Sequence, residues 1–253
     1  MPHAIPLAQP LPATIAGIQL TGARWVGLTE SFKSNCALGD NDIGTVPAGK
    51  RWLVLQAFAY NAAAGNVGVY HEAKIGGTYY RLTTSATIST LSVNNAVIGF
   101  ALDAGESIAA NIITNTGLNI WYKILEFDAT VRVGSSRVLS LANGNNTVYT
   151  VPATYSSILL DPQFSLANTT GGGGNNNLFY VNSSGGSRNI YWNVVPSGGA
   201  VGSGNQVVNT TAASDGTRSN VVCLTTLAAG DFVNVNTNAA LNQIAWVNYA
   251  ELP

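Results

Sequence analysis

Alternation of apolar and polar residues with a period of two runs through most of this chain and predicts β-strands. The segment from residue 51 to residue 61 is apolar on both faces, which is typical of a central strand covered on both sides. One predicted face carries Trp52, Val54, Phe58 and Tyr60, and the other carries Leu53, Leu55, Ala57 and Ala59. A second long strand is predicted near residue 120, where two sets of side chains alternate along the chain and point to opposite faces. These sets are Ile120, Tyr122 and Ile124, and Trp121, Lys123, Leu125 and Phe127.

Glycine-containing turn signals separate the predicted strands at roughly even spacing. They include residues 76–77, 103–105, 143–144 and 229–230. No segment combines a helical period with capping residues. Short strands with Gly and Asn turns indicate an all-β protein built from antiparallel sandwiches of the jelly-roll type.

The chain also contains an internal repeat, which is informative about domain organisation. The tetrapeptide Thr-Val-Pro-Ala occurs at residues 45–48 and again at 150–153, an offset of 105 residues. Farther along, LDAGE at 102–106 matches LAAGD at 227–231, an offset of 125 residues. We assign the difference to longer loops in the second copy.

The repeat predicts two tandem β-sandwiches that arose by internal duplication. We expect residues 18–128 to form the first sandwich and residues 129–253 to form the second, with longer loops rich in Gly, Asn and Ser. Trp121 matches Trp246 at the same offset of 125 residues, and we expect both indoles in the core.

Residues 1–17 differ from the rest and predict an extended N-terminal arm. Four of the nine prolines fall here, and proline excludes both a helix interior and a central strand. The apolar side chains of the arm are candidates for contact with a neighbouring subunit, the alternative being a disordered tail. They are Ile5, Leu7, Leu11 and Ile15.

Composition narrows the functional classes. Only 9% of the residues are charged and the net charge is −1, while 46% are hydrophobic, which excludes a mostly disordered chain. The 11 Lys and Arg residues form no basic stripe, so nucleic acid is not an expected partner. No apolar stretch is long enough to span a membrane, and the N-terminus lacks the features of a signal peptide. A charge-poor surface favours association, so we expect a homo-oligomer.

Candidate chemistry is sparse, and we expect neither an enzyme nor a cofactor or metal site. The two histidines are His3, in the arm, and His71, and the two cysteines, Cys36 and Cys223, are expected to be buried thiols. Residues 39–42 (GDND) match only the start of a calcium loop. The remaining acidic residues of interest recur in both copies, so we expect them to serve the fold. They are Asp103, Glu106, Glu126, Asp231 and Glu251.

One aromatic pair stands apart from these structural residues. Tyr191 and Trp192 have no counterpart in the first copy and adjoin the longer loops of the second. Glycan-binding sandwiches stack sugars on exposed aromatic rings, so we expect this pair to be exposed as a contact site.

The first copy resembles a β-sandwich module that is common in virion structural proteins of tailed bacteriophages. The likeness lies in residues 45–52 (TVPAGKRW), 76–80 (GGTYY) and 102–107 (LDAGES), and it is looser in the second copy. That family is non-enzymatic and serves as head decoration (cement) or as tail and baseplate components. The resemblance therefore implies a virion structural protein that contacts the major capsid protein or other virion subunits.

From these observations we expect a capsid decoration (cement) subunit located in the virion and assembled in the host cytoplasm. Three-fold sites are the natural positions for decoration subunits, so by analogy we expect the homo-oligomer to be a trimer. A tail, baseplate or fibre component of the same virion is the first alternative. A module that binds host glycans is the second, and it predicts saccharide affinity around Tyr191 and Trp192.

Overall fold

The alternating pattern folds into β-strands throughout the described part of the chain. The computed structural model describes residues 14–15, 18–83, 86–164, 188–195, 205–212, 225–237 and 244–252. These residues hold twenty strands and one four-residue helix, α1 (Leu28–Ser31). Every strand pair among them is antiparallel. The prediction of an antiparallel all-β protein is confirmed.

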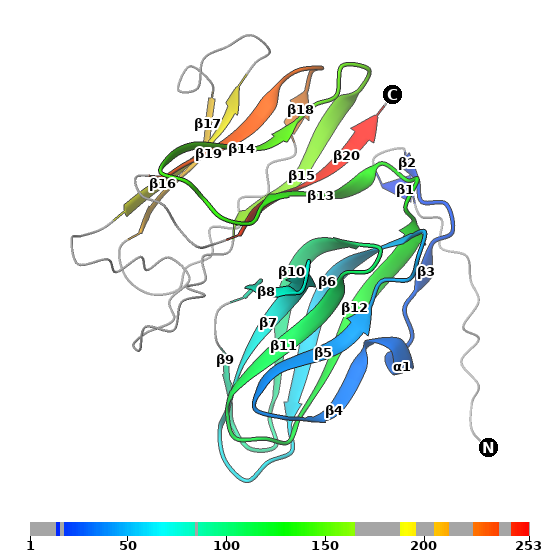
Figure 1. Ribbon diagram of the computed structural model, residues 1–253, viewed down its shortest axis with the longest axis vertical. Helices are drawn as coiled ribbons and strands as arrows, with labels where there is room; N and C mark the ends of the chain where they lie inside the picture. Colours follow the sequence, from blue (N-terminus) through cyan, green and yellow to red (C-terminus); the bar gives the residue numbers. More distant parts are fainter. Residues whose placement is uncertain are drawn as a thin grey trace.

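Residues 24–128 supply two five-stranded sheets that face each other (Figure 1). The first, called the β6 sheet, has the order β10-β6-β12-β3, with β4 also paired to β12. The second, called the β7 sheet, has the order β5-β11-β7-β8, with β9 also paired to β7. The strands of the β6 sheet are β3 (Arg24–Trp25), β4 (Phe32–Cys36), β6 (Lys50–Asn61), β10 (Val93–Asp103) and β12 (Leu118–Asp128). Those of the β7 sheet are β5 (Gly39–Thr45), β7 (Val67–Ile75), β8 (Thr78–Arg81), β9 (Ala86–Ile88) and β11 (Ser107–Thr114).

Residues 133–252 supply two four-stranded sheets, and a short hairpin precedes β3. The β20 sheet has the order β13-β20-β15-β18, and the β16 sheet has the order β14-β19-β16-β17. Their strands are β13 (Val133–Val138), β14 (Gly144–Thr150), β15 (Ser156–Phe164), β16 (Arg188–Val195), β17 (Asn205–Ala212), β18 (Thr225–Leu227), β19 (Phe232–Thr237) and β20 (Ala245–Leu252). The hairpin consists of β1 (Thr14–Ile15) and β2 (Ile18–Gln19).

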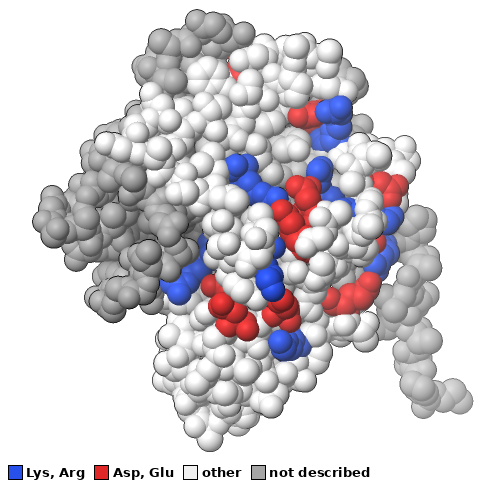
Figure 2. Space-filling view, in the orientation of Figure 1, with Lys and Arg blue, Asp and Glu red and all other residues white. Residues whose placement is uncertain are grey.

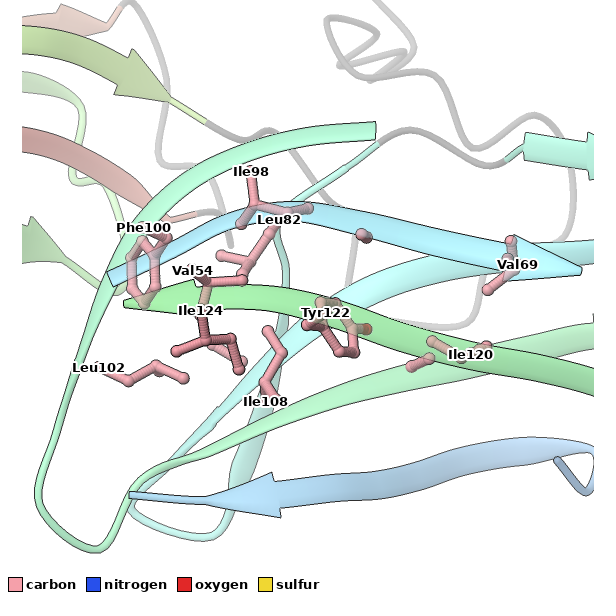
Figure 3. Close-up of a cluster of buried hydrophobic side chains, with 14 of the residues drawn as sticks. Val54, Val69, Leu82, Ile98, Phe100, Leu102, Ile108, Ile120, Tyr122 and Ile124 are labelled. Atoms are coloured by element: carbon pink, nitrogen blue, oxygen red, sulfur yellow. The ribbon is translucent and has the colours of Figure 1, made fainter. Parts of the chain in front are cut away.

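The core of the first sandwich forms between the β6 and β7 sheets. Figure 3 shows Val54 of β6 and Ile124 of β12 pointing toward Ile108 of β11 across the gap between the layers. All three side chains are fully buried. Burial of such side chains contributes about 1.5–3 kcal/mol each, so this contact between the two layers stabilises the sandwich.

A β-bulge in β6 changes the face assignment that the sequence predicts. Lys123 pairs with Gln56 and Ile124 pairs with Val54, so Leu55 is left without a partner. An extra residue reverses the alternation beyond it. The buried positions are consequently Trp52, Val54, Ala57, Ala59 and Asn61. The prediction that Phe58 and Tyr60 share a face with Trp52 is wrong.

The two sandwiches repeat the same local hydrogen bonds. The backbone N–H of Val46 donates to the carbonyl of Glu106 at 2.8 Å, and that of Val151 donates to the carbonyl of Asp231 at 2.8 Å. The Asn41 amide bonds both backbone groups of Ala37. Asn146 bonds both backbone groups of Ala142 in the same way, 105 residues later. These pairs have the same offsets as the sequence repeat.

The second sandwich rests on β10, the edge strand of the β6 sheet. Trp246 Nε1 and Asn248 Nδ2 donate to the carbonyl of Gly99 at 3.0 and 2.8 Å. The backbone N–H of Ala101 donates to Ser135 Oγ at 2.8 Å. Side chains of the β20 sheet therefore satisfy backbone groups that an edge strand would otherwise leave open to another chain.

Ionic contacts reinforce this junction. Arg51 of β6 donates to Asp103 Oδ1 at 2.7 Å and to the carbonyl of Val133 at 2.7 Å. Arg137 of β13 bonds Glu106 and lies 3.5 Å from Asp103 Oδ2. Figure 2 shows the charged side chains gathered in a band across the middle of the visible face, with an uncharged lower end.

Candidate functional site

The outer face of the β6 sheet carries an aromatic cluster, which we call the aromatic face. It forms because the bulge at Leu55 places the side chains of Phe58 and Tyr60 on the outer face of the sheet. The neighbouring strand β12 keeps its regular alternation there, so Trp121 lies on the same outer face. The aromatic face consists of Trp25, Phe32, Phe58, Tyr60 and Trp121, with Val93, Val97 and Lys123 at its borders.

Strand register places these side chains next to one another. Trp121 pairs directly with Phe58 on one side and with Phe32 on the other, so the three rings form a row across β6, β12 and β4. The rings of Phe58 and Trp121 are stacked, with centroids 5.4 Å apart and an interplanar angle of 7°. Tyr60, paired with Val93, lies in the next row. Cross-strand aromatic pairs stabilise a sheet and also leave flat ring surface available for contact.

The aromatic face is open to solvent and nearly free of charge. Trp25 is 42% exposed, Phe32 is 40% exposed and Val97 is 55% exposed, while Phe58, Tyr60 and Trp121 are half-buried. The ammonium of Lys123, the charged residue at its border, lies 5.3 Å from the ring centroid of Trp25. An apolar area of this kind on a charge-poor protein is typical of an interaction site.

Trp121 and its counterpart Trp246 have different environments. Trp246 is fully buried against the first sandwich, where its ring meets Phe100 edge to face at 5.2 Å. Trp121 lies on the open aromatic face. The expectation that both indoles are core residues is therefore correct for Trp246 and wrong for Trp121, because only Trp246 is covered by another sandwich.

The repeated glutamates accept hydrogen bonds inside the fold. Glu126 is 2% exposed and accepts from Trp52 Nε1 at 2.8 Å and from Arg24 Nε at 2.7 Å. Glu251 accepts from the Tyr149 hydroxyl at 2.9 Å and from Arg132 at 2.9 Å. Glu126 thereby joins β12 to β6 and β3, and Glu251 joins β20 to β14 and to the residue before β13, so both carboxylates have a structural role.

Replacing Glu126 with glutamine is expected to lower the free energy of unfolding by about 1–3 kcal/mol, because Trp52 donates to Oε2 and Arg24 Nε donates to Oε1, and glutamine replaces one of these acceptors with an NH2 group. Urea unfolding measures this loss. Glu30→Gln is the control, since the Glu30 side chain pairs with Arg24 at 2.8 Å but is 41% exposed. An exposed pair is worth less than about 1 kcal/mol. Equal losses in the two variants would show that burial of Glu126 is unimportant.

The buried histidine has a structural environment. His71 is 2% exposed, and its Nδ1 lies 2.9 Å from the hydroxyl of Tyr122, which donates to the carbonyl of Ala109 at 2.7 Å. Next to it in β7, Glu72 is 3% exposed, and burial, together with the charge of Asp40, raises the pKa of Glu72 to about 8. The hydroxyl of Tyr122 is thus used in a hydrogen bond to the backbone.

The fragment at residues 39–42 belongs to β5 and does not form a loop. Asp42 accepts from Lys74 at 2.6 Å and from the Tyr79 hydroxyl at 2.9 Å. Across the described ranges, no group of three or more His, Cys, Asp or Glu residues is placed to hold a metal ion. In the same ranges, no helix is long and apolar enough to cross a bilayer.

Most of the residues predicted as contacts from the sequence lie outside what can be described. Ile5, Leu7 and Leu11 are outside the described residues, as is Cys223, while Cys36 is a buried free thiol. Ile15 belongs to β1, where it pairs with Ile18. Tyr191 and Trp192 belong to β16, which is paired on both sides by β17 and β19, and their side chains are outside the described part.

Sequence reasoning missed the aromatic face. The signal that was available is the local density of aromatic residues in two strands, at positions 58, 60 and 121. Period-two counting assigned these rings to a covered face, because it cannot detect a bulge within a continuous apolar run.

Comparisons with known proteins add little to this picture. No protein-family model matches the chain, and no curated protein matches it. Among solved structures, the chain is similar to one described as the triple jelly roll fold and turret assembly in an archaeal virus, with 8% identity and a TM-score of 0.25. The match covers 87% of this chain and 59% of that chain, so this chain spans less than two thirds of its length. A TM-score this low carries no argument about fold or function.

Proposed function

We propose that this protein is a non-enzymatic structural subunit of a virion, and specifically a capsid decoration (cement) protein. The observation that carries the proposal is the aromatic face, an open and almost uncharged outer surface of the β6 sheet. Such a surface suits contact with other subunits better than catalysis or ion binding.

Two further observations support a role in assembly. The resemblance of residues 45–52, 76–80 and 102–107 to virion β-sandwich modules supports a virion as the particle to which the chain belongs. The matching hydrogen bonds of Asn41 and Asn146 support an origin of the two sandwiches by internal duplication. Coupling two modules through a buried junction yields a larger body that can bridge neighbouring subunits.

The proposed partners are further copies of this chain, in a trimer, and the major capsid protein. A cement subunit binds at sites where several capsid subunits meet, and cyclic symmetry matches such sites. A tail or baseplate position in the same virion is the alternative that this surface would serve equally well.

Electron microscopy of intact particles tests the proposal. We expect density for both sandwiches on the outside of the head, at a repeated symmetric position, with the aromatic face in contact with another subunit. Density on the tail would replace the cement role with the alternative. Absence of the chain from purified particles would overturn the virion role itself.

A further inference from the structure

We propose that the aromatic face of one copy is the docking site for residues 1–13 of the proline-rich N-terminal arm of a neighbouring copy. The proposal deepens the assembly role proposed above, since it names the two surfaces that join one copy to the next. It needs only the purified protein for its test.

The chemistry of the aromatic face matches that of the arm. Proline-rich segments bind to surfaces lined by aromatic rings, and the restricted unbound chain lowers the entropic cost of binding. The face supplies stacked rings of Phe58 and Trp121 with Phe32 beside them. The arm supplies three prolines before residue 11, at positions 2, 6 and 10, together with apolar side chains at positions 5, 7 and 11.

Charge also favours this occupant. Residues 1–13 contain no Arg, Lys, Asp or Glu. The described positions of the aromatic face include one charged side chain, Lys123, whose ammonium lies over Trp25. Contact between two nearly neutral surfaces requires little desolvation of charge.

The position and length of the arm allow it to reach another copy. The arm joins β1 at Thr14, and its root is anchored at the junction, where the backbone N–H of Asp128 donates to the carbonyl of Thr21 at 2.9 Å. Leu20 is 4% exposed and packs with Phe127 and Val133. Thirteen residues in polyproline form extend about 40 Å, which is about the length of the 12-residue strand β6.

A neighbouring copy is the proposed source of the arm, because the assembly role proposed above requires a contact between copies, and the described part of the chain leaves the aromatic face open. Trp25 and Phe32 each keep at least 40% of their surface open. Large apolar side chains that stay open in one chain and lie together are typical of surfaces that another chain covers. Exchange of arms between copies would also explain how a chain with few charges forms a specific oligomer.

Photo-crosslinking of the full chain tests the proposal directly. A benzoylphenylalanine residue is introduced in place of Leu7, and unlabelled and nitrogen-15-labelled chains are mixed before irradiation. We expect crosslinks between differently labelled chains that map to the β6 and β12 segments 56–60 and 119–125. Crosslinks confined to one chain, or crosslinks that map only to other segments, would overturn the proposal.

A pair of face variants provides the second measurement. Phe58→Thr combined with Trp121→Thr removes the stacked rings and keeps residues that favour strands. We expect the crosslinked fraction to fall about ten-fold, equivalent to the loss of 1.4 kcal/mol of binding free energy. Tyr79→Thr, on the outer part of the β7 sheet, is the matched control and should leave the fraction unchanged. An unchanged fraction in the face variant, with circular dichroism like that of the native chain, would contradict docking at this site.

These results separate the inference from the proposed virion role. Crosslinking in the purified protein can succeed even if the chain is absent from particles, and it can fail even if the chain is found on the head. Loss of the oligomer in the face variant without any crosslink from the arm would identify face-to-face pairing of two copies and would overturn docking of the arm.

Discussion

Replacing Trp246 with alanine is expected to lower the free energy of unfolding by about 3–5 kcal/mol, the usual cost of deleting a large buried aromatic side chain. Trp246 is fully buried, and its indole N–H donates to the carbonyl of Gly99 at 3.0 Å. The substitution would leave a cavity next to Phe100 and an edge-strand carbonyl without this donor. The same change should loosen the junction between the sandwiches, because Trp246 is the largest side chain there.

Urea unfolding and limited proteolysis measure these two effects. We expect a lower unfolding midpoint for Trp246→Ala and faster cleavage between residues 128 and 133, where β12 and β13 are joined. Trp121→Ala is the matched control, since it is the same residue type at the corresponding position of the first sandwich. Trp121 is half-buried and its ring stacks on Phe58, so a loss of about 1–2 kcal/mol is expected. Equal losses would contradict the view that the junction distinguishes the two tryptophans.

Stability is expected to fall as the pH rises from about 5 to about 8, because of Glu72. Burial and the charge of Asp40 raise the pKa of Glu72 from 4.5 to about 8, while the pairing with Arg81 at 3.6 Å opposes this shift. The folded state therefore keeps a proton that the unfolded state loses above pH 4.5. The stabilisation from this group is complete below pH 4.5 and is lost as the pH rises through 8.

The expected size of this effect is large for one side chain. Each pH unit between the two pKa values costs about 1.4 kcal/mol, so the loss amounts to several kcal/mol. Glu72→Gln keeps the shape but does not ionise, and it should flatten the profile and make the protein more stable than the native chain at pH 9. Urea unfolding at a series of pH values gives the profiles. A native slope that persists in Glu72→Gln would assign the pH dependence to another group.

Asp40→Asn provides an independent check on the cause of the raised pKa. The charge of Asp40 is the second cause of the shift, after burial. Removing it should lower the pKa of Glu72 and move the loss of stability to lower pH without abolishing it. A profile identical to that of the native chain would leave burial alone as the cause.

Local sequence patterns were sufficient to predict the strands and to identify which positions of the two halves of the chain match. The period of two in residues 118–124 corresponds to β12, where Leu118, Ile120, Tyr122 and Ile124 are buried. The prediction succeeds there because burial on one face of a regular strand depends on the pleat, which is a local property. It fails in β6 because a bulge changes the face and leaves no mark in a run of apolar residues.

The candidate site required contacts between distant segments. Phe32, Phe58 and Trp121 are up to 89 residues apart in sequence and become neighbours only through the register of β4, β6 and β12. The aromatic pair Tyr191 and Trp192 was predicted as a contact site because it adjoins long loops, a criterion that contains no information about sheet faces. Exposure of a ring depends on what packs over it, and no local pattern records that.

Trp121 and Trp246 show the difference between what the local sequence pattern determines and what tertiary contacts determine. The amino-acid sequence alone determined that both residues lie in a long strand at corresponding places of an all-β chain, because alternation and repeats are properties of neighbouring residues. Only the tertiary structure decided that one indole is buried against β10 and that the other remains on an open aromatic face. The physical reason is that two similar sandwiches in one chain share a single junction, so the outer face of only one of them is covered there.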